Sequence, residues 1–177
     1  MTDLDYQTLD RLMDRTKTKV FLTKNAGFLG PLMSAVNFLW TEDIKTAQTN
    51  GISLYWNPHW FLKLPEETRM TVLLHELWHV ALLHMLRCGT RNHKIWNWAC
   101  DLYINNMLYY QGYTFDGTHP WLNDDINRWK MPGAMPCGIY DTQMAVEEIY
   151  DLLEQMPALS VQGQFVWGHA ELDPVSG

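Results

Sequence analysis

An almost wholly apolar stretch over residues 71–86 predicts a buried helix. The sequence there reads TVLLHELWHVALLHML, which is apolar around the whole circumference of a helix and leaves no face for solvent. Pro65 suits the first turn of such a helix, and the two glutamates after it complement the positive end of the helix dipole. We expect the helix to continue to about Arg87, with Gly89 as its stop.

Weaker patterns predict the other elements. Partial apolar stripes indicate further helices over residues 3–17, 92–110 and 142–156. β-prone, nearly alternating residues predict two strands over residues 35–40 and 52–56, paired as a hairpin with a long connection. Glycine and proline predict turns at residues 27–31 and 48–51, and the remainder reads as a long ordered loop over residues 113–140 and a tail over residues 157–177.

Length and composition indicate a single domain. The chain has 177 residues, of which 47% are apolar, so we expect one domain over residues 1–177 with its core at about 25–155. No run of about 18 apolar residues predicts a membrane span. The formal net charge of −7 argues against nucleic acid and against an anionic membrane surface as partners. A protein or peptide is the expected partner.

The number and spacing of the cysteines indicate a cellular compartment. Cys88, Cys100 and Cys137 are odd in number and form no CxxC pair, which is typical of free thiols in a reducing compartment. The first residues lack the basic start and apolar centre of a signal peptide. The expected location is the cytoplasm of a bacterium, or of the host if the gene belongs to a phage.

The buried helix contains a complete HExxH motif, His75-Glu76-Leu77-Trp78-His79. Residues four apart lie about 40° apart around a helix, so His75 and His79 point to one side and can bind one zinc ion. Glu76 can then reach a water molecule on the metal and act as general base. Burying these groups without partners would cost roughly 2–7 kcal/mol each, and a bound cation offsets that cost.

A catalytic zinc ion requires a third protein ligand, and Asp101 is the candidate we favour. Asn97, Asp101 and Asn105 are spaced four apart, so they form one polar stripe on an otherwise apolar helix. If this helix packs against the HExxH helix, Asp101 can complete the metal site. The asparagines can then hold the ligands in place.

Other histidines and one other aspartate remain alternatives. On a continuous helix His84 would lie about 180° from His75 and about 140° from His79. It also lacks the glycine turn that brings a later histidine back to the metal, so we expect it to be a core histidine or a residue behind the ligands. The remaining alternatives for the third ligand are His93, Asp116, His119 and His169.

These motifs, in this order, resemble a bacterial and phage metallopeptidase domain that often precedes a von Willebrand factor A-like domain. The resemblance covers roughly residues 25–155. It rests on Thr46-Ala47, Thr49, Gly51, Tyr55-Trp56-Asn57-Pro58, Leu74 to Ala81 with His84 and Arg87, Trp96-Asn97, Ala99, Asp101, Ile104-Asn105 and Glu147-Glu148-Ile149-Tyr150.

The resemblance implies a zincin-like α+β fold, mostly helical, with a small β-hairpin or sheet beside the buried HExxH helix. It also implies a zinc-dependent peptidase with His75, His79 and Asp101 as Zn²⁺ ligands and Glu76 as catalytic base. The chain has no room for a von Willebrand-like domain, so we expect a stand-alone version or a fragment, with a partner protein in place of that domain.

Two other functions stay open. One is a catalytically silent, zinc-stabilised module that binds a protein through its many aromatic side chains. The other is a zinc amidase or nuclease, for which Arg87, Arg91 and Lys94 offer a local basic patch.

Overall fold

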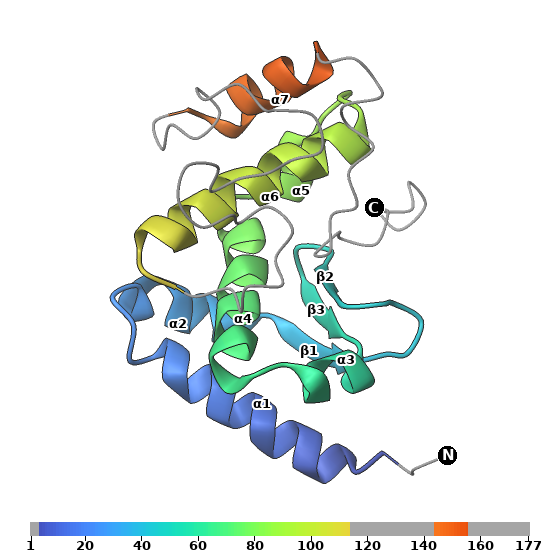
Figure 1. Cartoon of the computed structure of the whole chain (residues 1–177), viewed down its shortest axis with the longest axis vertical. Coiled ribbons are helices and arrows are strands. Elements are labelled where there is room, and N and C mark those ends of the chain that lie inside the picture. The colour runs from blue at the N-terminus through green and yellow to red at the C-terminus, as the bar shows by residue number, and fades with distance from the viewer. Residues whose placement is uncertain (1–3, 114–143, 156–177) are drawn as a thin grey trace.

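The computed structural model describes residues 4–113 and 144–155, which form a mostly helical fold with one small sheet (Figure 1). The α+β class is therefore confirmed. The loop expected over residues 113–140, apart from its first residue, and the tail over residues 157–177 lie outside the described residues. The described elements are α1 (Tyr6–Val20), α2 (Ala26–Ala35), β1 (Asn37–Trp40), β2 (Ala47–Thr49), β3 (Ser53–Trp56), α3 (Pro58–Lys63), α4 (Glu66–Ala81), α5 (His84–Arg87), α6 (His93–Tyr110) and α7 (Val146–Glu154).

The helix α2 corrects the turn predicted at residues 27–31. Pro31 lies inside it, preceded by Gly27 and Gly30, and these three residues are why the sequence reads as a turn. Tertiary packing decides otherwise, because Leu29 and Met33 are buried in the main core. Gly30 packs so closely against Phe21 that a Cβ atom at this position would lie 2.7 Å from the Phe21 ring.

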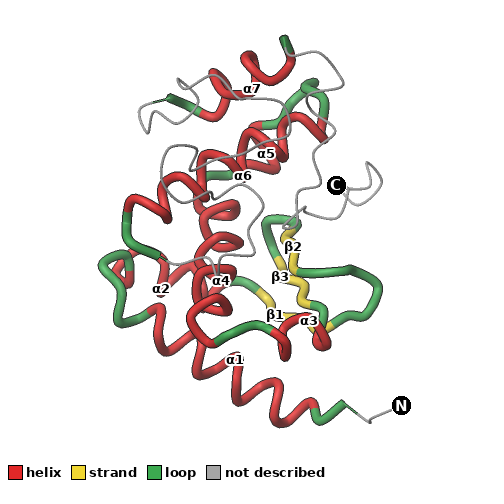
Figure 2. The backbone as a smooth tube through the Cα atoms, in the orientation of Figure 1, coloured by secondary structure: helices red, strands yellow, loops and turns green. Residues whose placement is uncertain are grey.

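The sheet has the order β1-β3-β2 (Figure 2). The strand β1 runs parallel and β2 antiparallel to β3. The predicted hairpin between the first and last of these strands is therefore wrong. The segment over residues 48–51, expected to be only a turn, overlaps β2, whose short Ala-Gln-Thr sequence carries no strand pattern. The true hairpin closes at Asn50 and Gly51: the Asn50 side chain accepts from the N–H groups of Ile52 and Ser53, and Gly51 has φ 90°.

The HExxH helix α4 ends at Ala81, six residues before the predicted end at Arg87. The chain breaks at Leu83, which has φ 55° in the left-handed region and is followed by the short α5. Such a conformation costs a non-glycine residue about 1–2 kcal/mol. Two hydrogen bonds brace the turn: Trp96 Nε1–H donates to the His84 carbonyl, and Arg87 Nη1–H donates to the Leu82 carbonyl.

The helix α6 matches the prediction over residues 92–110, and the Asn92 side chain caps it by accepting from the N–H groups of Lys94 and Ile95. The helix α7 packs along α6. Its Glu147 forms a bidentate ion pair with Arg87. The apolar residues of α6 and α7 form a second core cluster beside the main one, and α6 contributes to both.

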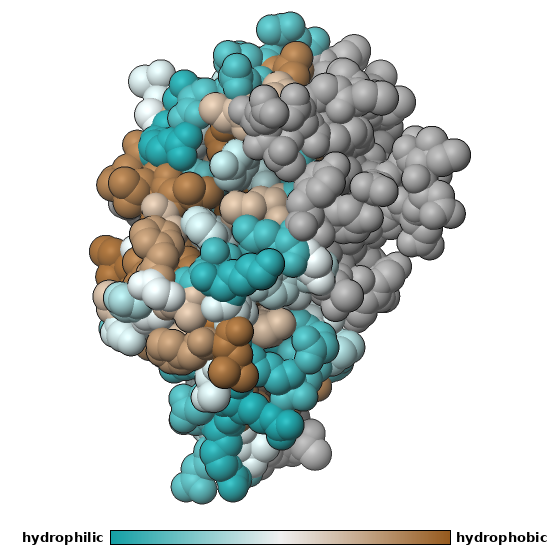
Figure 3. Space-filling model, turned by 90° about the vertical axis from the view of Figure 1, so that its left-hand side faces the viewer, coloured by the Kyte–Doolittle hydropathy of each residue, from teal (hydrophilic) through white to brown (hydrophobic). Residues whose placement is uncertain are grey.

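No helix among the described residues is long and apolar enough to cross a membrane. The described surface is mixed in polarity, and Figure 3 shows one face on which apolar groups gather beside a larger polar area. The large apolar side chains with the greatest exposure are Phe21, Leu22, Phe28, Ile52, Leu83 and Leu86.

Leu83 and Leu86 allow the strain at the helix break to be measured. Both side chains are exposed, but only Leu83 is left-handed, while Leu86 lies in α5. Glycine relieves left-handed strain and weakens a helix. We therefore expect Leu83→Gly to be about 1–2 kcal/mol more stable than Leu86→Gly in urea unfolding. Equal stabilities would contradict strain at this turn.

The ion pair between Arg87 and Glu147 predicts a pH dependence. Burial raises the pKa of Glu147, but the hydrogen bonds and charge of Arg87 outweigh it and hold this pKa below its usual range. A carboxyl whose pKa is lower in the folded state stabilises the fold above the unfolded-state pKa, and this stability is lost as pH falls through the folded-state pKa. The pair is partly exposed, so its contribution is at most about 1 kcal/mol.

We therefore expect wild-type protein to lose more unfolding free energy than Glu147→Gln between neutral pH and about pH 3, as measured by urea titrations. Asp151→Asn, which removes an exposed carboxyl from the same helix, should retain the wild-type dependence. A Glu147→Gln profile parallel to wild type would show that the pair does not contribute.

Candidate metal centre

The helices α4 and α6 pack against each other and bring three buried donor groups together. His75 and His79 project from α4, and Asp101 projects from α6. The Nε2 atoms of the two histidines are 3.0 Å apart, and Asp101 Oδ1 lies 3.2 Å from His75 Nε2 and 3.0 Å from His79 Nε2. These three residues form one of the two groups of potential metal ligands found among the described residues.

The spacing of these atoms fits a tetrahedral metal ion. Zinc–nitrogen and zinc–oxygen bonds of about 2.0–2.1 Å place neighbouring ligand atoms roughly 3.3 Å apart. The observed separations of 3.0–3.2 Å are only slightly shorter. Two imidazoles and one carboxylate, with a fourth position left for water, are also the donor set of a catalytic zinc ion.

Asn105 determines how His75 presents its lone pair. The Asn105 Oδ1 atom lies 2.7 Å from His75 Nδ1, so the Nδ1–H group donates to the amide oxygen. In the neutral ring, Nε2 then carries a lone pair that faces the Asp101 carboxylate and His79. Three acceptor atoms in such close contact, in a buried site, require a cation or a proton between them.

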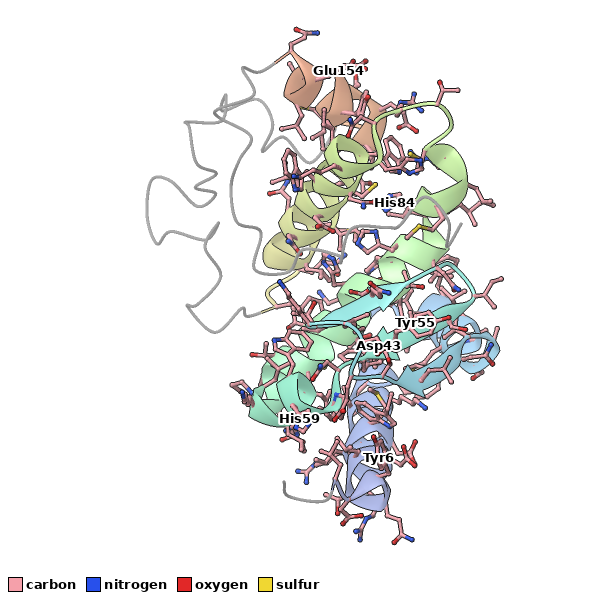
Figure 4. All side chains as sticks on the ribbon, turned by 90° about the vertical axis from the view of Figure 1, so that its right-hand side faces the viewer. Tyr6, Asp43, Tyr55, His59, His84 and Glu154 are labelled. Carbon is pink, nitrogen blue, oxygen red and sulfur yellow. The ribbon has the colours of Figure 1, made fainter. Side chains whose placement is uncertain are left out.

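His84 lies behind His79. The left-handed turn at Leu83 carries His84 back toward α6 (Figure 4), and its Nδ1 atom is 3.0 Å from His79 Nδ1. If His79 donates from Nδ1, its Nε2 lone pair is free for a metal, so His84 can fix the productive tautomer. The expectation that His84 lies behind the ligands agrees with this position, but the continuous helix assumed for it is wrong.

Glu76 is buried on α4 between the two histidines. It belongs to neither ligand group among the described residues. As the neighbour of His75 it is rotated about 100° around the helix axis, and its role as proton acceptor stays a prediction.

The second group of potential ligands is His79, His84 and Cys100, all three buried. Burial, followed by the nearby Asp101 carboxylate, raises the pKa of the Cys100 thiol well above its ordinary value. Sequence reasoning classified Cys100 only as a free thiol. Its position directly before Asp101 on a buried helix was the one available signal.

Of the alternative third ligands, the described residues include only His93. His93 lies at the start of α6, where its Nδ1 atom is 3.5 Å from Cys88 Sγ. Among the described residues it belongs to neither ligand group. Asp116, His119 and His169 lie outside the described residues.

Comparison with models of protein families shows the family of this chain. A family model described as "Putative metallopeptidase domain" matches residues 10–169. The chain belongs to this family. No curated protein and no solved structure is significantly similar to it. Membership of the metallopeptidase domain family, together with the two ligand groups, indicates a metal ion as cofactor.

Asn97 and Asn105 provide a matched test of the support around the donor set. They lie two turns apart on α6, but only Asn105 contacts His75. Loss of such a contact typically weakens metal binding by about 10–100-fold. We expect this loss for Asn105→Ala in competition with a chromophoric chelator, and near wild-type affinity for Asn97→Ala. Equal affinities in both variants would rule out the proposed role of Asn105.

Proposed function

We propose that the chain is a zinc-dependent metallopeptidase in which His75, His79 and Asp101 hold Zn²⁺ and Glu76 is the general base. The observation that carries this proposal is the convergence of the three donor atoms in a buried site beside Glu76. Membership of the metallopeptidase domain family supports the reaction class. A zincin-like arrangement of the HExxH helix beside a small sheet is part of the same proposal.

We propose zinc because the site combines nitrogen and oxygen donors. Nitrogen donors favour transition metals over Mg²⁺ or Ca²⁺, which prefer oxygen ligands. A set of two histidines and one carboxylate is a recurrent catalytic zinc site. The same set can accept Co²⁺, which makes it accessible to spectroscopy.

In the proposed reaction, an ion held by His75, His79 and Asp101 would supply a Lewis acid for the scissile carbonyl and lower the pKa of the attacking water. The Glu76 carboxylate takes a proton from that water as its oxygen bonds to the carbonyl carbon. Glu76 then returns the proton to the amide nitrogen as the carbon–nitrogen bond breaks. Asn105 and His84 hold the two rings in the required tautomers.

The outer edge of β2 is the strand edge that we propose for binding an extended peptide. The strand β3 offers no edge to a peptide because it is paired on both sides. Asn57 N–H donates to the Thr46 carbonyl and Asn50 N–H donates to the Ser53 carbonyl, so the alternating backbone groups at residues 47 and 49 face away from β3. The HExxH helix packs against β2, which supports the choice of this edge for addition of a peptide strand.

Glu76→Gln tests the reaction. Removal of a general base lowers the rate of cleavage by about 10²–10⁴-fold, while the metal content should remain that of wild type because Glu76 is not a ligand. The measurement is cleavage of a denatured-protein or peptide library by protein loaded with zinc, with metal content determined in parallel. His75→Ala should lose the metal itself.

The outcomes separate the candidate functions. Wild type that is fully loaded with metal and cleaves no faster than Glu76→Gln would exclude the peptidase and leave the zinc-stabilised binding module. Wild type that retains no zinc would exclude both.

A further inference from the structure

His79 is shared by two sets of buried donor atoms. Its Nε2 atom faces His75 and Asp101, and its Nδ1 atom lies 3.0 Å from His84 Nδ1. His79, His84 and Cys100 also each offer one ligand atom, and these atoms all lie within 4.8 Å of one another. Each of the three side chains is at most 2% exposed. One imidazole ring therefore borders two potential coordination sites.

The second set differs from the first in its chemistry. It replaces a carboxylate oxygen with a thiol sulfur, and sulfur with imidazole nitrogen is a donor set for zinc and other thiophilic ions. The fold also maintains this set at a cost, because the strained turn at Leu83 is what carries His84 to it. A structural role for His84 alone requires no sulfur atom at this position.

We propose that His79, His84 and Cys100 form a second metal site for a thiophilic divalent ion, with His79 bridging it to the first site. This inference rests on the proposed function only in assuming that His75, His79 and Asp101 hold a metal ion.

Charge balance favours such an ion in this interior. A thiol coordinates as thiolate, so binding displaces the proton of Cys100. Coordination by both nitrogens of His79 displaces the proton on its Nδ1. Two protons leave as one divalent cation enters, so the net charge of the buried space is unchanged. The large cost of burying uncompensated charge is thereby avoided.

Occupation of the second site would weaken the first as a Lewis acid. A bridging imidazolate is an anionic ligand, and it donates more electron density to the first ion than neutral imidazole does. Where the first site acts as a peptidase, the second ion is therefore inhibitory, and excess zinc should reduce cleavage.

Titration of the metal-free full chain with Co²⁺ tests the site, because a thiolate bound to Co²⁺ gives an intense near-ultraviolet charge-transfer band that nitrogen and oxygen ligands do not give. We expect the first equivalent to bind without this band and the second equivalent to produce it. Cys100→Ser should lose the band and the second equivalent while retaining the first. Cys88→Ser, which alters another buried cysteine, should retain both equivalents.

The wild-type titration decides the proposal even if a variant folds poorly. Wild type that saturates at one equivalent without a thiolate band overturns the second site and leaves the proposed peptidase intact. A band that persists in Cys100→Ser also overturns it. A band already present at the first equivalent and unaffected by Asp101→Asn supports the sulfur site and contradicts the assignment of the first.

Discussion

The packing of α4 against α6 depends on how the repulsion among three buried lone pairs is offset in an apolar interior. The helix α6 contributes to both apolar clusters and α4 to the main one, and the three donor side chains are at most 2% exposed, so bulk water hardly reaches them. A carboxylate and two imidazoles forced within about 3 Å of one another are costly unless positive charge lies between them. The packing of the two helices and binding of a cation are therefore one coupled equilibrium, in which the affinity for the ion adds to the stability of the fold.

Two sets of hydrogen bonds support the donor residues. His75 is held by Asn105 on α6. His79 contacts His84, whose carbonyl accepts from Trp96 of α6. Each ring is therefore positioned by a residue that is itself anchored on α6. Motion of α6 relative to α4 would disturb ligands and supports together, which favours a rigid site.

Sequence patterns predicted the strongly periodic parts of the fold and missed the parts decided by tertiary packing. The helix α6 was predicted closely because its apolar face is long and capped by Asn92. Residues His75, His79 and Asp101 were predicted to meet, and they lie together; their role as ligands stays a prediction. The helix α2 was missed because Gly30 and the proline after it favour turns locally, while the burial of Leu29, Gly30 and Met33 is a long-range effect.

The approach of His84 to His79 could not be foreseen for a related reason. Nothing in Leu82-Leu83 signals a helix break, since leucine is a good helix former and rarely adopts a positive φ. The break follows from contacts of Trp96 and Arg87 with backbone carbonyls at the turn. The strand β2 was missed because three residues without β-branched alternation carry too little pattern.

The contacts of α7 have a consequence for the order of folding. Glu147 reaches Arg87 across 60 residues of sequence, and the Tyr150 hydroxyl accepts from the Asn92 N–H across 58. Contacts between distant residues form late, because the intervening chain must first be closed into a loop. During synthesis, α4 and α6 leave the ribosome before α7, so they can begin to pack before α7 contacts the segment that joins them.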